Sequence, residues 1–269
     1  VGTKTAEFTI KKADVTMTAP TIMLGMIYTA QAQTLVAAGS AEGGEMQYAL
    51  DDVNYSTTLP QGTDAKEYSV YFKVVGDQNH NDVEAQNFKV TIDKAALTAA
   101  TLAKTSLVYN QQEQTALVAS VSAGTLTVPE GSYEVTGNKG TNVGTYTATI
   151  TGKGNFKGSV TAQFSIVADA EAVLVMTLDA TEYVYDGTEK KPAVTVKNGE
   201  TVLVEGTDYT LAYANNVNAG TAKVTATGKG NYASTKTVEY TIKKAQLTIK
   251  VDDAQVICGK EAPQYEVYD

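Results

Sequence analysis

A block of about 76 residues recurs along this chain of 269 residues, and a repeat of that length strongly constrains the fold. The stretch TITGKGNF at 149–156 returns as TATGKGNY at 225–232, 76 residues later. Three sets of aromatic residues follow the same spacing to within a few residues: Phe8, Phe88, Phe164 and Tyr240; Tyr28, Tyr109 and Tyr185; and Tyr133 with Tyr209. A chain with so short a period folds as a series of small modules rather than as one large domain.

The recurring positions divide the chain into three whole modules and two incomplete ones. Repeat 1 spans residues 13–94, repeat 2 spans 95–168 and repeat 3 spans 169–244. Residues 1–12 are predicted to be the last strand of a truncated preceding repeat, and 245–269 the incomplete start of a fourth. Both end segments lack the strands that would complete their sheets. We therefore expect them to be disordered or to pair with a neighbouring chain.

Within each repeat the hydrophobic pattern has a period of two. The run Val238-Glu239-Tyr240-Thr241-Ile242 alternates apolar and polar side chains, which is typical of a strand with one face on a core. No window of eleven or more residues shows a helical period. In repeat 3 the pattern predicts seven strands, near 173–178, 181–185, 192–197, 201–204, 208–213, 221–227 and 236–243. We expect an all-β fold: a tandem array of small Ig-like β-sandwich modules in an elongated rod of roughly 100 Å.

Modules of this size have little core, since a chain of ~60 residues hides only about 60% of its unfolded surface. The 16 tyrosines must supply much of each core, with hydroxyls that reach backbone carbonyls at the rim. Only four residues separate Ile92 from Leu97, and the other linkers have four to six. Such linkers are too short to act as flexible tethers, so we expect adjacent repeats to pack together.

The charged and reactive residues exclude several classes of function. The chain has 21 Lys, no Arg and 30 acidic residues, and a net charge of -9 disfavours nucleic-acid binding. One histidine (His80) and one cysteine (Cys258) cannot build a zinc cage, an Fe–S cluster or an internal disulfide. We therefore expect no cofactor and no enzyme activity. No apolar run approaches the ~18 residues that span a bilayer, so we expect no membrane insertion within this segment and any export signal or anchor outside it.

Repeat 3 contains three motifs that point to a known group of proteins: Tyr185-Asp186-Gly187, Glu205-Gly206-Thr207-Asp208-Tyr209 and Gly228-Lys229-Gly230-Asn231-Tyr232. With them it resembles the tandem bacterial surface repeats called Ig-like or YDG-type. The stretch 257–263 with Tyr265 resembles the related mucin-binding-like (MBG, YGX-type) repeat, with Cys258 where that family usually has Tyr. Repeats 1 and 2 depart from the motif, with Tyr28-Thr29-Ala30 and Tyr109-Asn110-Gln111 in place of Tyr-Asp-Gly.

This resemblance implies a secreted or cell-surface bacterial protein, often an adhesin, in which the repeats act as stalks or carry contacts. It leaves two topologies open, an Ig-like sandwich and a grasp-like β module. The absence of a helical period favours the sandwich.

The surroundings of His80 suggest either a base or a metal site. Asp77, Asn79, Asn81 and Asp82 have the oxygen spacing of a calcium loop. Phe156 and Tyr232 occupy the position of His80 in the other repeats, and Lys153 and Lys229 occupy that of Asp77. We therefore favour a planar side chain resting on a turn, with a calcium site as the alternative.

Three other features have structural interpretations that we prefer to chemical ones. The Gly-x-Gly-Asn turns at 152–155 and 228–231 lack the helix and the Lys-Ser/Thr pair of a phosphate loop, and indicate a turn that needs a positive φ. Cys258 is expected to be a partly buried structural residue rather than a reactive thiol. A Lys–Asn isopeptide crosslink would suit a surface rod, but it needs a proximity that sequence does not give.

Two functions remain. The first is a non-catalytic stalk or spacer that projects a functional domain from a bacterial cell surface, with neighbouring repeats as its partners. The second is an adhesin module that binds host glycoprotein or polysaccharide through repeat 1, using exposed tyrosines such as Tyr48, Tyr55 and Tyr71. Within repeat 1, residues 13–92 carry 10 acidic residues against 3 lysines, which disfavours acidic glycans there.

Overall fold

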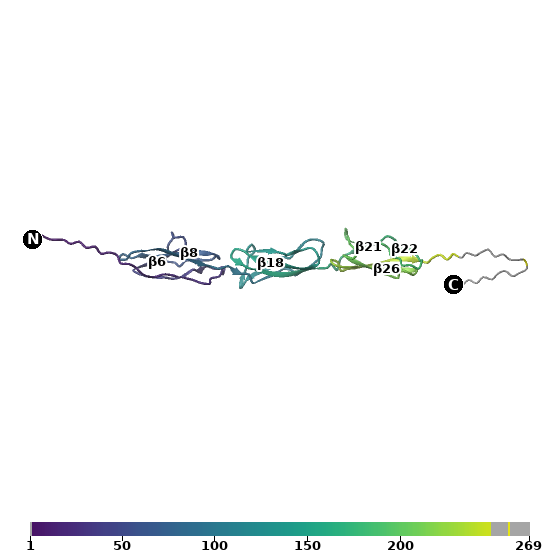
Figure 1. Cartoon of the computed structure of the whole chain (residues 1–269), viewed down its shortest axis with the longest axis horizontal. Helices are drawn as coiled ribbons and strands as arrows, with labels where there is room; N and C mark the ends of the chain where they lie inside the picture. Colours follow the sequence, from purple (N-terminus) through teal and green to yellow (C-terminus); the bar gives the residue numbers. More distant parts are fainter. Residues whose placement is uncertain (1, 249–257, 259–269) are drawn as a thin grey trace. The chain divides into compact units, whose positions relative to one another are not determined.

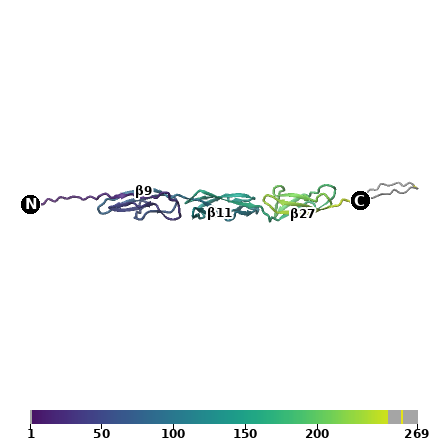
Figure 2. The same cartoon turned by 90° about the horizontal axis from the view of Figure 1, so that it is seen from below.

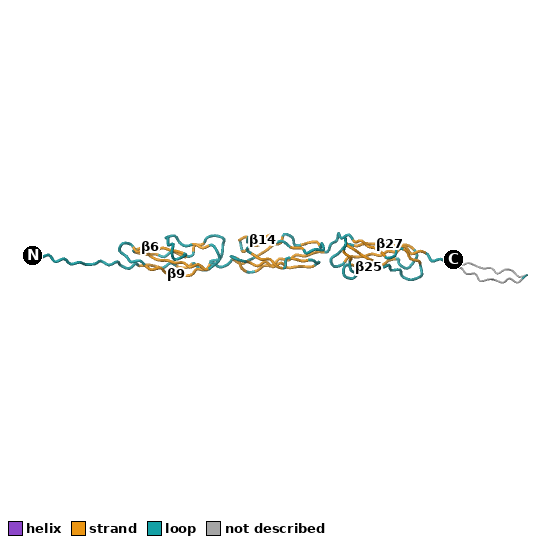
Figure 3. Tube along the Cα trace, turned by 90° about the horizontal axis from the view of Figure 1, so that it is seen from above, coloured by secondary structure: helices purple, strands orange, loops and turns teal. Residues whose placement is uncertain are grey.

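The computed structural model describes residues 2–248 and Cys258. This part of the chain consists of strands joined by turns and loops and contains no helix (Figure 3). The predicted all-β class is confirmed. The chain divides into two compact units, residues 1–167 and 168–269, which are described separately.

The first unit begins with nine strands that lie within repeat 1 (Figure 1, Figure 2). They are β1 (Thr16–Thr18), β2 (Thr21–Ile22), β3 (Gln33–Thr34), β4 (Val36–Ala37), β5 (Ser40–Glu42), β6 (Gly44–Ala49), β7 (Gln61–Gly62), β8 (Glu67–Gly76) and β9 (Val83–Thr91). The main sheet is antiparallel in the order β6-β8-β9, and the shorter strands pair as β1-β5, β2-β4 and β3-β7. A core that includes Leu35, Val70 and Ile92 is buried between them.

Eleven strands of the same unit lie within repeat 2. They are β10 (Ala95–Ala96), β11 (Ala99–Leu102), β12 (Ser106–Val108), β13 (Gln114–Thr115), β14 (Val118–Ala123), β15 (Leu126–Thr127), β16 (Tyr133–Thr136), β17 (Lys139–Gly140), β18 (Gly144–Gly152), β19 (Phe156–Lys157) and β20 (Ser159–Val167). A sheet in the order β12-β20-β18-β16 packs on a sheet in the order β11-β14-β15. Side chains of both sheets share one core, so this part of the chain is a β-sandwich.

The second unit holds the seven strands of repeat 3. They are β21 (Leu174–Leu178), β22 (Glu182–Val184), β23 (Val194–Asn198), β24 (Thr201–Val202), β25 (Tyr209–Ala214), β26 (Gly220–Gly228) and β27 (Thr235–Lys243). They form one sheet in the order β21-β23-β24 and a second in the order β22-β27-β26-β25. All seven strands predicted for this repeat are confirmed, each within two residues at its ends.

Backbone hydrogen bonds support the alignment of the repeats. In each repeat, the N–H group of this tyrosine donates to a backbone carbonyl at the end of the last strand of the repeat or just past it. The three bonds are Tyr28 to Asp93, Tyr109 to Val167 and Tyr185 to Lys243, at 2.8 to 2.9 Å. The residue two places after each tyrosine has a left-handed backbone: φ is 62° at Ala30, 66° at Gln111 and 80° at Gly187. The glycine of the Tyr-Asp-Gly motif therefore serves a turn that all three repeats make.

Tyrosine hydroxyls reach backbone carbonyls at the rims, as expected. The Tyr68 hydroxyl donates to the Asp64 carbonyl at 2.9 Å, and the Tyr146 hydroxyl donates to the Asn142 carbonyl at 2.7 Å. Each of these bonds returns four residues up the chain, as in the tyrosine corner of Ig-like folds. Repeat 3 has Ala222 at this position, and its Tyr240 hydroxyl instead reaches the Lys190 carbonyl at 2.5 Å.

The two end segments differ from the repeats. Residues 2–12 form no strand, and Phe8 and Ile10 are 84% and 85% exposed. Residues 244–248 also form no strand, and the rest of the predicted fourth repeat lies outside the described residues, apart from Cys258. Cys258 is exposed, so its prediction as a partly buried residue was wrong. That prediction placed it in an aromatic core position, whereas no described strand packs against it.

Candidate functional site

The outer face of the β6-β8-β9 sheet in repeat 1 carries the most distinctive side chains. Along β8, Val70, Phe72 and Val74 are buried, while Tyr71 and Lys73 alternate with them on the other face. Tyr55, from the loop after β6, joins this face: the Lys73 Nζ lies 4.2 Å from the centroid of the Tyr55 ring. Two of the three predicted ligand-binding tyrosines, Tyr55 and Tyr71, are thus brought to one surface.

An acidic loop holds Tyr55 in place. The Asp51 carboxylate accepts hydrogen bonds from the backbone N–H groups of Val53 and Asn54, at 3.1 and 2.9 Å. These bonds, with that from Asn54 first, hold the pKa of Asp51 below its usual value. The Tyr55 hydroxyl donates to Asp52 Oδ1 at 2.5 Å. Burial and, after it, this bond to Asp52 raise the pKa of Tyr55 to about 12.

The third predicted ligand-binding residue, Tyr48, was placed wrongly. It is only 4% exposed, and its hydroxyl accepts a hydrogen bond from the Gly39 N–H at 2.9 Å. Tyr48 lies opposite Phe72 in the β6–β8 pairing, and Phe72 faces the core. Tyr48 therefore belongs to the interior of repeat 1 and cannot contact a surface ligand.

A shallow depression of about 300 Å³ adjoins Tyr55. Its charged lining consists of Lys73 with Asp52, Asp82 and Glu84. Three carboxylates around one lysine repel anions, and the half-buried Tyr55 ring lies beside them. Lys73 was missed by the sequence analysis, although its alternation with Val70, Phe72 and Val74 signals the outer face.

Three of the four residues of the calcium alternative, Asp77, Asn81 and Asp82, have side-chain hydrogen-bond partners of their own around the turn at His80. Asp77 Oδ1 accepts from the Asn79 N–H at 2.8 Å and lies 2.7 Å from His80 Nδ1, which holds the pKa of Asp77 below its usual value. Asp82 Oδ1 accepts from the Gly76 N–H at 2.8 Å. The Asn81 side chain instead donates to Asp14 Oδ1 at 3.0 Å. The calcium site stays a prediction.

The His80 ring rests on a turn, as the sequence analysis preferred. A Cβ added to Gly43 would lie 2.5 Å from the His80 ring, so the ring covers this glycine closely. Across residues 2–248 and Cys258, no three His, Cys, Asp or Glu side chains gather in a way that could hold a metal ion.

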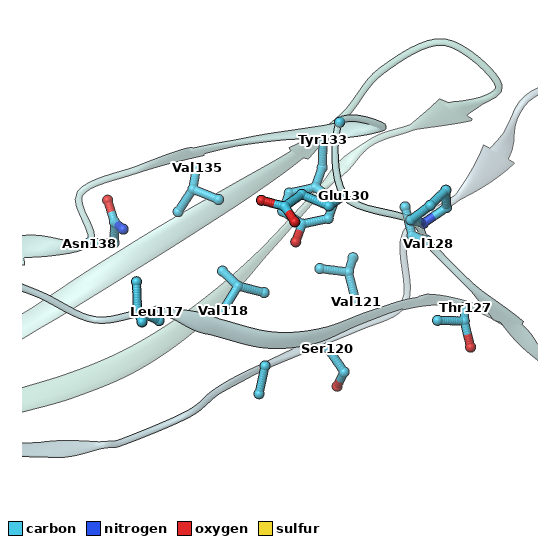
Figure 4. A pocket seen from close by; sticks show the side chains of 13 residues that line it. Leu117, Val118, Ser120, Val121, Thr127, Val128, Glu130, Tyr133, Val135 and Asn138 are labelled. Carbon is cyan, nitrogen blue, oxygen red and sulfur yellow. The ribbon is translucent and has the colours of Figure 1, made fainter.

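A groove of about 830 Å³ opens between the two sheets of repeat 2. Figure 4 shows Val118 and Val121 of β14 facing Val135 of the opposite sheet. Its lining includes one carboxylate, Glu130, and one phenol, Tyr133, and is otherwise apolar or uncharged. The residues that line this groove include no lysine and no histidine.

The junction between repeats 1 and 2 is closely fitted. The Tyr28 ring packs against the cores of both repeats and meets the Phe156 ring edge to face, with centroids 5.4 Å apart. Asn155 bridges the same junction, because its Oδ1 accepts from the Ala65 N–H at 2.8 Å and its Nδ2 donates to Asp64 Oδ1 at 3.1 Å. The sequence analysis missed this role of Asn155, although Asn79 and Asn231 recur at its position.

Each linker also pairs with a turn of the repeat that follows it. The parallel bridges join Ala13 to His80, Ala95 to Phe156 and Asp169 to Tyr232. The three partners are the residues that the sequence analysis aligned. The turns contain the predicted positive φ, 59° at Gly154 and 65° at Gly230. The linkers are therefore hydrogen-bonded segments rather than free tethers.

No protein-family model matches this chain, and no curated protein matches it. Twenty-one chains of solved structures are distantly similar, among them the following three. Drosophila N-cadherin EC1-4 has 12% identity and a TM-score of 0.28, with 84% of this chain and 74% of that chain covered. PcdhgB3 EC1-4 has 11% identity and a TM-score of 0.22, with 84% and 76% covered. The Bacteroides ovatus mixed-linkage glucan utilization locus SGBP-B, in complex with a heptasaccharide, has 10% identity and a TM-score of 0.20, with 87% and 71% covered.

Scores this low carry no argument about function, and the all-β architecture rests on the strand pairing of the chain itself. Within the described part of the chain, no helix has the length and apolar character needed to cross a membrane.

Proposed function

We propose that this chain is a non-catalytic spacer: a series of three β modules, repeats 1 to 3, that holds another domain away from a bacterial cell surface. The observation that carries the proposal is the junction between repeats 1 and 2. Tyr28 belongs to both cores there, and Asn155 joins the two repeats by two hydrogen bonds. A linker of this kind resists bending, which a spacer requires and a flexible tether does not provide.

The strand pairing supports the same role. In repeats 2 and 3 the last strand pairs in parallel with an early one, β12 with β20 and β22 with β27. A pull along the chain loads parallel strands in shear, so their hydrogen bonds share the force. The resemblance of Tyr185-Asp186-Gly187 and its companion motifs to YDG-type surface repeats supports placing the protein outside the cell.

Single-molecule stretching of the full chain tests the division into three modules. Three unfolding events are expected, each lengthening the chain by roughly 220 Å, because about 76 residues extend to roughly 260 Å and the folded module already spans roughly 30–40 Å. One or two larger events would contradict three independent modules. A chain in which residues 93–96 are replaced by glycines and serines is the matched control for the junction. It should keep all three events if the modules fold independently.

The second candidate function is binding of a neutral polysaccharide or glycoprotein glycan on the outer face of repeat 1. Tyr71 on strand β8 and Tyr55 on the neighbouring loop favour it, because aromatic rings on a surface can stack on sugar rings. The surrounding carboxylates, including Asp52 and Glu84, disfavour acidic glycans.

A glycan array probed with the full chain tests this second function. Binding to neutral glycans that Tyr55→Ala and Tyr71→Ala each reduce at least tenfold would support it. Tyr133→Ala, which changes a tyrosine of repeat 2, is the control and should leave binding unchanged. An array without hits, alongside a working lectin control, would contradict it.

A further inference from the structure

The groove of repeat 2 lies where the other repeats carry larger inward-facing side chains. Val135 of β16 lines the groove (Figure 4) and lies opposite Ile150 of β18. Repeat 1 has Tyr48 at this position, and repeat 3 has Leu211. Each of the three pairs with the residue four places after the aligned rim residues Tyr68, Tyr146 and Ala222. Valine is the smallest of the three side chains, so this position fills the space between the sheets least in repeat 2.

Repeat 1 closes this space with a phenol ring. Tyr48 starts from β6, and its hydroxyl accepts a hydrogen bond from the Gly39 N–H at 2.9 Å, in the segment between β4 and β5. Those two strands belong to other sheets than β6, so the ring spans from one layer to the other. Tyr48 is 4% exposed and belongs to the core. A tyrosine ring therefore fits between the sheets of this type of module.

Repeat 3 places a second ring in the same region. Tyr213 stands where repeat 2 has Gly137, and its hydroxyl donates to the Pro192 carbonyl at 2.9 Å. The matching carbonyl of repeat 2, that of Ala116, accepts instead from Asn138 Nδ2 at 3.1 Å. Asn138 is part of the groove lining. Repeat 2 thus satisfies this carbonyl without a ring, and the space beside it stays open.

The groove has one charged side chain in its lining, the carboxylate of Glu130. None of the ion pairs within residues 2–248 includes Glu130. Glu205 is its counterpart in repeat 3, since each glutamate precedes a glycine with a left-handed backbone, φ 88° at Gly131 and 85° at Gly206. A carboxylate beside an apolar groove favours a partner with a positive charge.

Repeat 3 also shows which groups accompany this glutamate. Burial and, after it, the charge of Glu205 raise the pKa of Tyr213, so the carboxylate lies close enough to act on the phenol. The Lys191 Nζ lies 6.0 Å from the centroid of the Tyr213 ring. Repeat 2 has Gly137 and Thr115 in place of Tyr213 and Lys191. Its groove therefore lacks both the ring and the positive charge that repeat 3 supplies from its own chain.

The strands beside the groove leave room for an added strand. Within the described chain β16 has a neighbour on one side only, β18. On the opposite sheet β15 covers β14 only at Ser122 and Ala123. An extended segment can pair with the open edge of β16, and alternate side chains of that segment then point into the groove.

We propose that the groove of repeat 2 binds a tyrosine side chain of a partner protein, carried on an extended segment with a basic residue two positions away. The ring takes the space that Tyr48 fills in repeat 1, and the basic side chain pairs with Glu130. Residues two positions apart on a strand share a face, so both reach the groove together. The volume of about 830 Å³ lies within the usual range of ligand sites. This inference does not depend on the spacer function.

The test uses the full chain and a fluorescent peptide of sequence TKTYTKT, whose anisotropy is measured. We expect saturable binding with a Kd below about 1 mM. The peptide TKTATKT, without the ring, should bind at least tenfold more weakly. The peptide TETYTET, which keeps the ring and reverses the charge, should also bind at least tenfold more weakly. No saturable binding of TKTYTKT up to about 1 mM, or equal binding of the three peptides, would overturn the proposal.

Variants of the chain locate the site. Val135→Tyr fills the groove as Tyr48 fills repeat 1, and should weaken binding of TKTYTKT at least tenfold without lowering the melting temperature. If that chain melts lower, Val135→Leu, which introduces the residue of repeat 3, takes its place and should weaken binding several-fold. Binding that neither substitution changes would contradict the groove as the site.

The charge has its own matched pair of variants. Glu130→Gln should weaken binding several-fold and flatten its dependence on salt, because the ion pair to the peptide lysine is lost. Glu205→Gln changes the counterpart in repeat 3 and should leave binding unchanged. Hydrogen exchange should slow within 117–138 when the peptide binds. Equal effects of the two glutamate variants, or slowing confined to repeat 3, would overturn the assignment to repeat 2.

Discussion

The ring of Tyr146 lies so close over Gly140 that a Cβ at this glycine would overlap it. The same arrangement is found in repeat 1, because a Cβ at Gly62 would lie 2.6 Å from the Tyr68 ring. Repeat 3 has neither residue. Asn216 stands at the position of Gly140 and is buried, and Ala222 stands at that of Tyr146. The glycine and the tyrosine are therefore both present or both replaced. We infer that the space above this position holds a tyrosine ring in repeats 1 and 2 and the Asn216 amide in repeat 3.

This pairing predicts a double-mutant cycle. Gly140→Ala should lower the free energy of unfolding by about 1–3 kcal/mol, because the new methyl group collides with the Tyr146 ring. In the background of Tyr146→Ala the same change should cost less, which gives a coupling energy of roughly 0.5–3 kcal/mol. Denaturant unfolding measures all four chains.

Gly144→Ala is the control for this cycle. A Cβ there would lie 3.8 Å from the Tyr146 ring, an ordinary contact, so coupling to Tyr146 should be small. Equal coupling for Gly140 and Gly144 would contradict the overlap. Separately, Tyr146→Phe should cost about 0.5–1.5 kcal/mol, since it removes the hydrogen bond to the Asn142 carbonyl.

The two turn residues with left-handed backbones, Gln111 and Gly187, predict substitutions with opposite effects on stability. Gln111 has a φ of 66°, a region that disfavours a residue with a Cβ, so Gln111→Gly should stabilise by about 0.5–1 kcal/mol. Gly187 holds the same place in repeat 3 with a φ of 80°, and Gly187→Ala should destabilise by about 1 kcal/mol. Thermal melts should move in opposite directions. A rise for both, or a fall for both, would show that the turn conformation is not the cause.

Asn155 should couple repeats 1 and 2. Asn155→Ala removes the bonds to Asp64 and to the Ala65 N–H, and we expect a loss of roughly 1–3 kcal/mol from the junction. Hydrogen exchange at the Ala65 amide should speed up accordingly. Asn79→Ala is the matched control at the equivalent turn. There the Asn79 backbone carbonyl accepts from the Ala13 N–H, a bond that the substitution keeps. Similar exchange at Ala65 in both variants would contradict the role of Asn155.

Asp186 predicts the response of repeat 3 to acid. The Lys190 ammonium and the Thr188 hydroxyl and N–H all donate to its carboxylate, which holds the pKa of Asp186 well below its usual value. A lowered carboxyl pKa contributes stability that is complete above the unfolded pKa of about 3.9 and is lost as pH falls toward the folded pKa. Asp186→Asn should therefore lower the melting temperature at pH 6 and lower it less at pH 2, where part of the contribution has been lost. A difference that does not change with pH would contradict the charge pairing.

The sequence alone predicted the strands well and the orientation of single tyrosines less well. The strands of repeat 3 follow from a period-two pattern broken by turn residues, which are local features. Whether Tyr48 faces the core depends on its register opposite Phe72, and that register involves a strand about 25 residues away. The contact of Lys73 with Tyr55 depends on the path of the loop at 50–56, which no periodicity encodes.

The repeat also held information that the sequence analysis did not use. Asn79, Asn155 and Asn231 align, yet only three-dimensional packing shows that the Asn155 side chain reaches residues 64 and 65.

Small-angle X-ray scattering of the full chain in dilute solution tests the spacer function most directly. A compact chain of this length would have a radius of gyration of about 18 Å. Three modules of roughly 30–40 Å in series would give a rod of about 100 Å with a radius of gyration near 29 Å. The proposed spacer predicts a value of about 29 Å or more, with the scattering profile of a rod. A value near 18 Å, with the profile of a globule, would contradict it.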